Sequence, residues 1–274
     1  MSVPLTNLDR VLWPRTGFTK GDLVAYYRAV APALLPHLER RPLTLWRFPS
    51  GVHRRGWWQN ECRGAPEWLA VAELRGQRFC VVEDERGLTW VANQGTVESD
   101  RERVQLDRPE LASRLVLDLD PGAPAGLLDA CEVAVAARPL LGEAAAVKVS
   151  GGSGLHVVLP LAEPRPFPEV KARARELADR LAAGLGGRVV AEQRRAARSG
   201  KVLVDWLQND PTRTTVAPWS LRAAAEPSVA VPIAWAEVEE AIARGDAGRL
   251  RFSPERALAR LDEQGDLWAP LAAL

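Results

Sequence analysis

The segment LVLDLDPG, residues 115–122, places two aspartates at the end of an apolar stretch that is typical of a buried β-strand. Residues i and i+2 of a strand point to the same face, so Asp118 and Asp120 would project side by side, about 6.5–7 Å apart. Carboxylates at that spacing can bind one divalent cation or bridge two, and hard oxygen ligands favour Mg²⁺ or Mn²⁺. The segment therefore predicts a metal site. The alternative interpretation is a solvated strand end that carries two surface aspartates.

A second carboxylate follows another apolar stretch, in the segment KVLVDWLQND of residues 201–210. Asp205 comes after three apolar residues of a strand expected at 201–206, and removing an unpaired carboxylate from water is costly. Asp205 therefore requires either a cation or hydrogen-bond donors. A helix cap or a salt bridge would satisfy it as well as a metal would.

A glycine-rich turn, SGGSGLH of residues 150–156, lies between strands expected at 146–150 and 155–160. Three glycines within five residues let the backbone approach a ligand closely, and consecutive amides can cradle an anion. A simple hairpin loop explains the glycines equally well, but it does not explain His156 at the mouth of the second strand. Because a strand follows the turn, neither a P-loop nor a dinucleotide-binding fingerprint fits.

Cationic residues gather in the second half of the chain. Residues 192–222 contain six arginines or lysines and three acidic residues, a local net charge of +3. A basic segment beside metal-binding carboxylates suits a nucleoside triphosphate, because arginines can hold its phosphates. From charge alone, a solvated charged loop is the alternative.

Aromatic residues alternate with cations nearer the N-terminus, in Trp46-Arg47-Phe48 and in the run HRRGWW that ends at Trp57 and Trp58. Bases stack on aromatic faces beside a cationic track in proteins that bind single-stranded nucleic acids. Adjacent residues of a strand point to opposite faces, so we expect at most one of the two neighbouring tryptophans in the core.

The remaining pattern indicates an α/β or α+β fold. Residues 19–38 read as a helix with Thr19 as N-cap, although Pro32 and Pro36 argue against its last turns. A β-rich stretch is expected from 43 to 97, with a turn at Arg86-Gly87. Further helices are expected at 124–141, 167–185 and 235–243. The length allows one large domain or two small ones, and a smaller N-terminal lobe would end near residue 75.

The composition is that of an ordinary globular enzyme, with 47% hydrophobic and 26% charged residues and a net charge of +1. A nucleic-acid partner must therefore be sought in local clusters of charge. Three cysteines, an odd number without a C-x-x-C pair, argue against a disulfide framework or zinc ribbon and fit a reducing cytoplasm. No signal peptide or membrane-spanning stretch is expected, so we predict a cytosolic, soluble chain.

Taken in order along the chain, these motifs resemble the archaeo-eukaryotic primase superfamily, and specifically the polymerase domain of bacterial ligase D. The resemblance begins at LTNLDRVLWP (5–14), continues through GFTK (17–20) and RPLTL (41–45), and includes the three motifs described above. It ends at TTVAPWSLR (214–222) and so covers nearly the whole chain.

The resemblance implies an α/β (α+β) fold in which an RRM-like, mostly antiparallel central sheet with flanking helices forms an open catalytic cleft. Residues 1–274 would form a single primase-polymerase catalytic domain. Its activity would be that of a template-dependent nucleotidyltransferase, a DNA repair polymerase or primase. Such an enzyme fills gaps or extends ends with NTPs or dNTPs during end-joining repair, using two Mn²⁺ or Mg²⁺ ions.

The family's functional residues transfer onto matching positions of this chain. The catalytic carboxylates and metal ligands would be Asp118, Asp120 and Asp205. The nucleotide would be bound by Ser150, Gly151, Ser153, Gly154, His156, Arg198, Lys201, Gln208 and Arg222. DNA would be contacted by Asn7, Arg10, Lys20, Arg47, Trp57 and Trp58, of which the first three match a pocket for a 5′-phosphate. The tryptophans replace a phenylalanine pair that stacks on DNA.

The implied partners are DNA with a gap or break and a 5′-phosphate, NTPs or dNTPs, a DNA ligase and Ku, in the bacterial cytoplasm or nucleoid and away from membranes. The 274 residues show no ligase or nuclease module, so sealing is expected to need another protein or another domain. Three positions depart from the family pattern: Ser153 stands where Lys or Arg is usual, Trp46 replaces a lysine, and Ser99 replaces a histidine.

Two other classes of function also fit parts of the pattern. A haloacid-dehalogenase-like phosphatase places a D-x-D motif after an apolar strand, with the first aspartate, here Asp118, as nucleophile. A non-catalytic nucleic-acid-binding relative would keep the fold without the chemistry. Metal-dependent incorporation of a nucleotide into a gapped duplex would separate the three hypotheses.

Overall fold

The computed structural model describes residues 3–102 and 104–272, and its chain divides into two compact units. The first unit combines residues up to Asp107 with Thr214–Ala230 and Phe252–Ala273, and the second combines Arg108–Arg213 with Val231–Arg251. The N-terminal segment of the first unit thus extends well past residue 75. The sequence-based expectation of one catalytic domain over 1–274 stays a prediction.

The first unit is built on an antiparallel sheet with the strand order β13-β7-β3-β6-β5, with β4 paired to β3. Two short ladders, β1–β2 and β14–β15, accompany it. The strands are β1 (Val11–Trp13), β2 (Phe18–Thr19), β3 (Leu43–Arg47), β4 (Trp57–Gln59), β5 (Val71–Leu74), β6 (Gln77–Cys80), β7 (Thr96–Glu102), β13 (Thr214–Val216), β14 (Leu221–Arg222) and β15 (Ser228–Val229).

The helices of this unit are α1 (Lys20–Leu38), α2 (Glu85–Asn93), α6 (Pro254–Gln264) and α7 (Ala269–Ala272). Thr19 caps α1 and forms a capping box with Asp22, as predicted. The helix continues through both prolines to Leu38, because its apolar stripe is buried and packing outweighs two lost backbone bonds. Tyr27 ties α1 to the sheet by donating to the Val97 carbonyl at 2.5 Å.

Helix α2 lies within residues 43–97, where a β-rich stretch with a turn at Arg86-Gly87 was expected. Asp84 caps α2 by accepting from the Gly87 amide at 2.7 Å, so the predicted turn at Arg86-Gly87 is the first turn of a helix. Across the described residues, no helix combines the length and apolar character that a membrane crossing requires.

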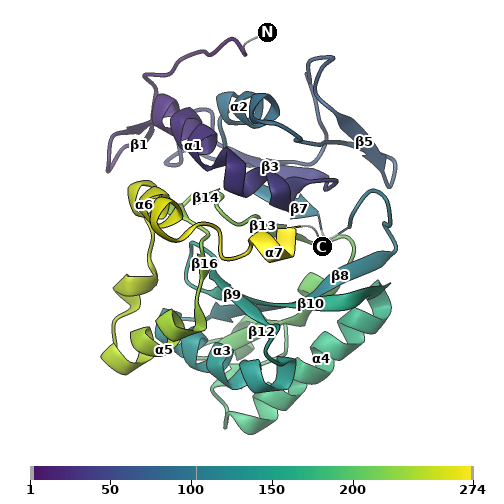
Figure 1. Cartoon of the computed structure of the whole chain (residues 1–274). Coiled ribbons are helices and arrows are strands. Elements are labelled where there is room, and N and C mark those ends of the chain that lie inside the picture. Colours follow the sequence, from purple (N-terminus) through teal and green to yellow (C-terminus); the bar gives the residue numbers. More distant parts are fainter. Residues whose placement is uncertain (1–2, 103, 273–274) are drawn as a thin grey trace. The chain divides into compact units, whose positions relative to one another are not determined.

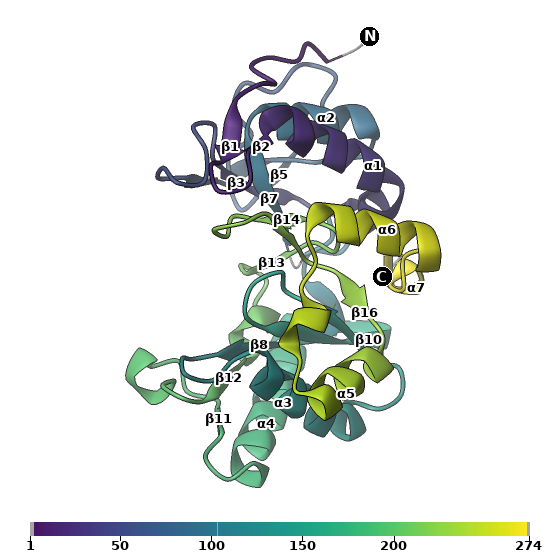
Figure 2. The ribbon, with the colours of Figure 1, turned by 90° about the vertical axis from the view of Figure 1, so that its left-hand side faces the viewer.

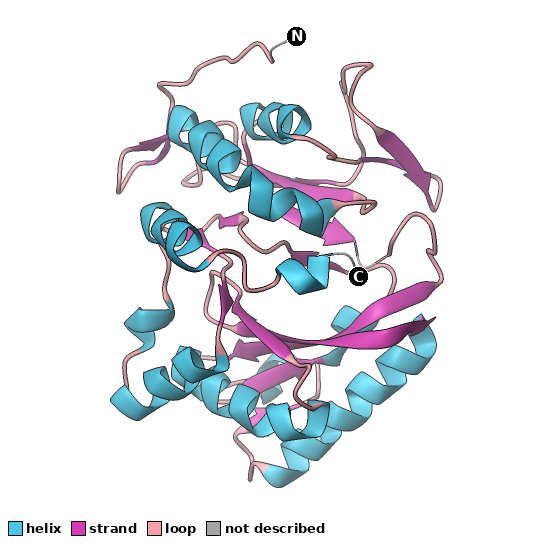
Figure 3. Ribbon diagram, in the orientation of Figure 1, coloured by secondary structure: helices cyan, strands magenta, loops and turns pink. Residues whose placement is uncertain are grey.

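The second unit contains a six-stranded sheet in the order β11-β12-β8-β10-β9-β16 (Figures 1 and 3). Its elements are β8 (Leu111–Pro121), α3 (Leu127–Leu141), β9 (Ala146–Val149), β10 (Leu155–Pro166), α4 (Phe167–Gly184), β11 (Val189–Val190), β12 (Val202–Asp205), β16 (Pro232–Ile233) and α5 (Trp235–Arg244), with short 3₁₀ turns at η1 (Arg195–Ala197), η2 (Trp206–Asn209) and η3 (Ala247–Leu250). The series β8-α3-β9-β10-α4-β12 is a βαββαβ unit with antiparallel neighbours. The RRM-like antiparallel sheet expected from the sequence is confirmed.

One face of this sheet is covered by helices. Both α3 and α4 pack against β8 and β10, and two views at right angles place them on the same side (Figures 1 and 2). The side chains of Leu115, Leu117 and Leu119 are fully buried. They alternate along β8 with Asp118 and Asp120, so the carboxylates point to the opposite face. The apolar face of β8 thereby determines on which side the aspartates lie.

An asparagine side chain completes the edge of β8 where its neighbouring strand ends. Strand β12 pairs with β8 only from Asp118 to Pro121. At Val116, fully buried Asn209 takes over, accepting from the Val116 amide at 2.8 Å and donating to the Val116 carbonyl at 2.7 Å. Asn209 also donates to the Trp206 carbonyl, which fixes the turn after Asp205.

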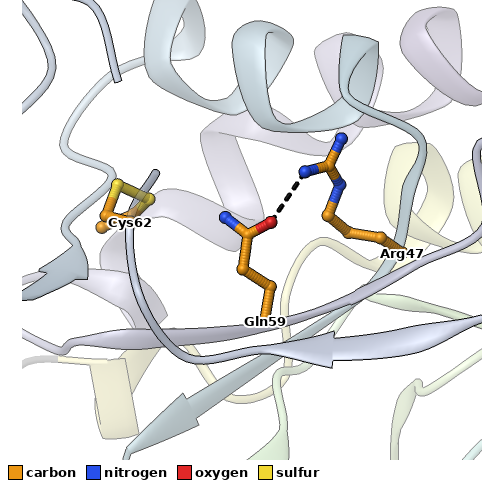
Figure 4. Close-up of a disulfide and its surroundings, with 4 residues drawn as sticks. Arg47, Gln59 and Cys62 are labelled. Atoms are coloured by element: carbon orange, nitrogen blue, oxygen red, sulfur yellow. Dashed lines mark hydrogen bonds between the residues drawn. A yellow bond between two sulfur atoms is a disulfide. The ribbon is translucent and has the colours of Figure 1, made fainter. Parts of the chain in front are cut away.

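The cysteine pattern argued against a disulfide framework, but the structure contains a disulfide. Cys62 and Cys80 form one, with their Cα atoms 5.0 Å apart, next to the hydrogen bond between Arg47 and Gln59 (Figure 4). The 18-residue separation in sequence does not reveal this pairing, because it is the β5–β6 hairpin that brings Cys80 back beside Cys62. Cys131 is buried, and burial raises its pKa to about 12.

We predict that Asn209→Ala lowers the free energy of unfolding by roughly 2–4 kcal/mol, because it leaves a buried amide and carbonyl of β8 without partners. Urea denaturation measures the loss. Asn60→Ala, at an exposed position, is the matched control and should cost almost nothing. Equal unfolding midpoints for the two variants would show that Asn209 does not hold the strand.

Candidate active site

Strand register brings three of the predicted site residues into one row. Asp118 on β8 lies directly opposite Asp205 on β12 and directly opposite His156 on β10. His156 in turn faces Lys148 on β9. Directly opposed residues of neighbouring strands share a face, so the four side chains project from the face that carries Asp120.

Asp118 stands at the centre of this row and is 8% exposed. Its Oδ1 lies 3.4 Å from His156 Nε2, and its Oδ2 accepts from Gln208 Nε2 at 3.3 Å. Gln208 Oε1 is buried and has no hydrogen-bond partner among the described residues. A buried acceptor of this kind is costly to leave unsatisfied, so its place beside Asp118 is suited to a ligand that donates.

Asp205 is held through only one of its two carboxylate oxygens. Oδ1 accepts from the Leu207 amide at 3.0 Å and from Gln193 Nε2 at 3.1 Å. Within the described residues, Oδ2 has no hydrogen-bond partner. The helix-cap alternative considered from the sequence is therefore partly correct, since Asp205 caps the short turn η2. The cap leaves one oxygen available for a cation.

The glycine-rich turn lies against the end of β8. The Ser150 amide donates to the Gly154 carbonyl at 3.0 Å, and Ser150 Oγ accepts from the Gly152 amide at 3.2 Å. A Cβ at Gly154 would lie 2.2 Å from the Leu119 carbonyl oxygen and 3.4 Å from Asp120 Oδ1. Only glycine permits this approach, so the turn is placed beside the carboxylates by its sequence.

The basic loop 194–201 lies against the same end of β8. Gly122 donates to the Lys201 carbonyl at 2.8 Å, and a Cβ at Gly122 would lie 2.2 Å from the Arg198 carbonyl oxygen. Arg198 Nη2 donates to the Gln193 carbonyl at 2.6 Å. The second unit thus brings together Asp118, Asp120, Ser150, Gly151, Ser153, Gly154, His156, Arg198, Lys201, Asp205 and Gln208 at one end of its sheet.

The site contains the oxygen donors that the predicted metal site requires, but these donors do not surround a metal position. Among the described residues, no group of three or more histidine, cysteine, aspartate or glutamate side chains is arranged to hold a metal ion. The open Oδ2 of Asp205 and the carboxylates of Asp118 and Asp120 are nevertheless hard oxygen ligands on one face, which is the donor type that Mg²⁺ and Mn²⁺ prefer.

Sequence reasoning missed two residues of this region. Lys148 is 1% exposed and continues the row from Asp118 and His156. A lysine inside the apolar strand AVKV was the signal, because a buried cation requires a polar surrounding. Gln193 contacts Asp205 from a loop that no periodic pattern describes.

The predicted phosphate pocket lies in the first unit, at the start of α1. Lys20 is 5% exposed and donates to the Thr6 carbonyl, while Arg10 Nη1 donates to the Pro49 carbonyl at 2.7 Å. Burial, with the positive charge of Arg10, lowers the pKa of Lys20. Asn7 adopts a left-handed φ of 52° in the loop that wraps this helix end. The three predicted residues are thus neighbours, with Lys20 also serving to hold the loop.

The two tryptophans of β4 are both at the surface, with exposed fractions of 46% for Trp57 and 48% for Trp58. The sequence predicted at most one of them in the core, and neither is there. Trp58 stacks on Trp46, with ring centroids 4.6 Å apart, and the Arg47 guanidinium lies over Trp57 at 5.3 Å. Arg47 also donates to Gln59 and to the Gln94 carbonyl, so its charge is held in place beside the aromatic faces.

Arg222 belongs to the first unit rather than to the unit that carries the carboxylates. Its Nη1 lies 3.2 Å from Glu98 Oε2, and Glu98 Oε1 accepts from the Ala223 amide at 2.8 Å. Burial raises the pKa of Glu98 to about 7, against the opposing effect of the Arg222 charge. Glu98 was not singled out by its sequence, because an acidic residue in a predicted strand is ordinarily solvated.

Comparison with known proteins assigns this architecture. A family model described as the primase-polymerase domain of LigD matches residues 19–268. The chain belongs to the LigD primase-polymerase domain family. The multifunctional non-homologous end joining protein LigD of Mycolicibacterium smegmatis is 36% identical over 99% of this chain and 36% of its own length. The bifunctional LigD of Bacillus subtilis is 27% identical over 95% of this chain and 42% of its own length.

A solved structure agrees with the family. The polymerase domain from Mycobacterium tuberculosis Ligase D, in complex with DNA, matches with a TM-score of 0.89 and 34% identity over 99% of this chain and 98% of that one. This LigD-type domain spans about a third of the M. smegmatis relative and 42% of the B. subtilis one. The resemblance inferred from the sequence is confirmed, and the phosphatase alternative is not favoured.

The three departures from the LigD pattern have distinct surroundings. Ser153 is exposed at the tip of the glycine-rich turn. Trp46 stacks on Trp58 and so extends the aromatic surface where a lysine is usual. Ser99 is buried, with its amide donating to Ser220 Oγ at 3.0 Å.

We predict that Glu98 makes the stability of the chain depend on pH. Its folded pKa of about 7 lies above the usual 4.5, so the folded state binds the proton more tightly. The resulting stabilisation is complete below pH 4.5 and is lost as the pH rises through 7, by up to about 3 kcal/mol.

Glu98→Gln should remove this component. Urea unfolding of both proteins at several values between pH 4.5 and 8 measures it, with the variant gaining relative to the wild type as the pH rises. Parallel stability curves for the two proteins would contradict the shifted pKa.

Proposed function

We propose that this domain transfers nucleotides to a DNA primer strand, filling gaps or extending ends during non-homologous end joining. The observation that carries the proposal is the row of Asp118, Asp205 and His156, fixed by strand register beside the glycine-rich turn and the basic loop. Family membership and the match to a DNA-bound polymerase domain support the same chemistry.

The carboxylates are proposed to hold two divalent cations, Mn²⁺ or Mg²⁺. When bound, the ions would neutralise the reacting phosphates and activate the primer hydroxyl for in-line attack. Asp118 and Asp120 from one strand and the open Oδ2 of Asp205 from its neighbour would hold the ions.

The triphosphate is proposed to lie between the glycine-rich turn and the basic loop. Ser150 and the amides of Gly151 to Gly154 would face the phosphates from one side. Arg198 and Lys201 would neutralise them from the other, with His156 donating from within the sheet. Gln208 Oε1, buried and without a partner in the described part of the chain, would accept from a donor of the bound nucleotide.

DNA is proposed to contact the first unit through two surfaces. Trp57 and Trp58, with Trp46 stacked beneath, would support unpaired bases by stacking, and Arg47 adds a cation beside them. Asn7, Arg10 and Lys20 would bind the 5′-phosphate of a break. A DNA ligase, or a further domain of a longer protein, would then seal the product, and Ku would be a partner in end joining.

We predict that Asp118→Ala or Asp205→Ala lowers the rate of nucleotide incorporation into a gapped duplex by roughly a hundredfold or more, since each removes a cation ligand. The fold should persist, because removing one of the three neighbouring carboxylates Asp118, Asp120 and Asp205 relieves repulsion between like charges. Primer extension with Mn²⁺ and with Mg²⁺ measures the rate, and thermal unfolding checks the fold.

Exposed Asp262→Ala, on α6, is the matched control and should extend primers as the wild type does. If the rate of Asp205→Ala stayed within about tenfold of the wild-type rate, the activation free energy would differ by no more than about 1.4 kcal/mol. That result would exclude the two-metal assignment. An inactive wild type would instead favour the non-catalytic relative.

We also predict that a 5′-phosphate on the downstream strand tightens DNA binding by roughly tenfold or more at low salt, because charge-assisted contacts are worth about 1.5–3 kcal/mol before screening. Arg10→Ala should remove most of this preference. Arg10 is the better test than Lys20, which also holds the Thr6 loop.

Fluorescence anisotropy with phosphorylated and unphosphorylated gapped duplexes gives the ratio of dissociation constants. Arg15→Ala removes an exposed arginine of the same unit outside the predicted pocket and should preserve the ratio. A ratio near one for the wild type, or the same ratio in Arg10→Ala, would remove this site from the proposal.

A further inference from the structure

Gln193, in the loop between β11 and β12, contacts both Asp205 and Arg198 of the candidate site. Gln193 Nε2 donates to Asp205 Oδ1 at 3.1 Å, and Gln193 Oε1 accepts from Arg198 Nη2 at 3.2 Å. The same Nη2 also donates to the backbone carbonyl of Gln193 at 2.6 Å. One residue therefore joins a proposed metal ligand to a proposed phosphate-binding arginine.

The chemistry of its two partners requires an amide at this position. A carboxylate only accepts hydrogen bonds and a guanidinium only donates them, so Oε1 must face Arg198 and Nε2 must face Asp205. A glutamate would satisfy Arg198 but repel Asp205, and a lysine would satisfy Asp205 but repel Arg198. Glutamine provides both a donor and an acceptor without adding charge between the two.

The contact decides which oxygen of Asp205 is available. With the Leu207 amide and Gln193 both donating to Oδ1, that oxygen has two donors and the carboxylate is held in one orientation. Oδ2 is then the oxygen for which the described residues provide no partner. If Gln193 were removed, Leu207 alone would hold the carboxylate, and rotation would exchange the two oxygens more freely.

We propose that Gln193 is a positioning residue that acts through Asp205, presenting its Oδ2 to a divalent cation while keeping Arg198 beside the triphosphate. The inference rests on the proposed two-metal function and adds the element that couples the metal ligand to the basic loop. Groups that orient a metal ligand from behind typically contribute about 10–100-fold to metal affinity or activity.

The test uses Gln193→Met, which keeps the length of the side chain and removes both polar atoms. Gln264→Met, at the exposed end of α6, is the matched control. Binding of Mn²⁺ to the protein without nucleotide or DNA is followed by the electron paramagnetic resonance signal of the free ion. We expect the dissociation constant to rise roughly tenfold in Gln193→Met and to stay unchanged in Gln264→Met.

A double-mutant cycle separates positioning from a general structural effect. If Gln193 acts through Asp205, adding Gln193→Met to Asp205→Ala should not weaken Mn²⁺ binding further. An equal further loss in the double variant would overturn the inference. Thermal unfolding without metal checks that all four proteins are folded.

Gap-filling activity gives the second readout. Gln193→Met should need roughly tenfold more Mn²⁺ for half-maximal rate and should recover most of its kcat at saturating Mn²⁺. An unchanged metal requirement with a reduced kcat would contradict the role assigned to Gln193. If the wild type is active and Gln193→Met behaves like Gln264→Met in both Mn²⁺ binding and gap filling, this inference alone is overturned. If the wild type incorporates no nucleotide, the proposed function is overturned instead.

Discussion

The pairing of β8 with a strand on each side is the interaction on which the candidate site depends. Asp118 can face both Asp205 and His156 only because β10 and β12 are aligned on β8 in one register. A shift of either neighbour by one residue would turn its functional side chain to the face covered by α3 and α4. The buried Val157 of β10 and Val204 of β12 oppose such a shift, since it would move these apolar side chains off the helix-covered face and turn His156 or Asp205 onto it.

Close backbone approach then brings the loops to the same end of this sheet. Gly154 and Gly122 each sit where a Cβ would meet a carbonyl oxygen at 2.2 Å, one from β8 itself and one from the basic loop. The glycine-rich turn and the loop with Arg198 are therefore positioned by the same strand that carries the aspartates. Three motifs far apart in sequence meet because one strand supports all of them, and small residues allow the contacts.

Much of the candidate site was predictable, because its residues lie in sequence motifs at the ends of apolar strands. The strands that carry Asp118, His156 and Asp205 are short apolar runs next to turn residues, and the ordered series of motifs along the chain indicates the family. Helix α2 was missed because Arg86-Gly87 resembles a turn, while the capping bond from Asp84 that makes it a helix start is a local geometric detail. The Cys62–Cys80 bond was missed for a different reason: strand pairing brings the two cysteines together, and spacing alone does not reveal it.

The limits of sequence reasoning are clearest at the polar contacts around Asp205. Its strand could be inferred, but which of its oxygens is held depends on a glutamine twelve residues earlier in an irregular loop. No periodicity marks Gln193, and its role follows only from the distances to Asp205 and Arg198. Because the amide matches one acceptor and one donor at once, it links the charge of the carboxylate row to the charge of the basic loop. The end of β12 and the loop before it are therefore coupled, because moving the Asp205 carboxylate would disturb the Arg198 guanidinium and moving Arg198 would disturb Asp205.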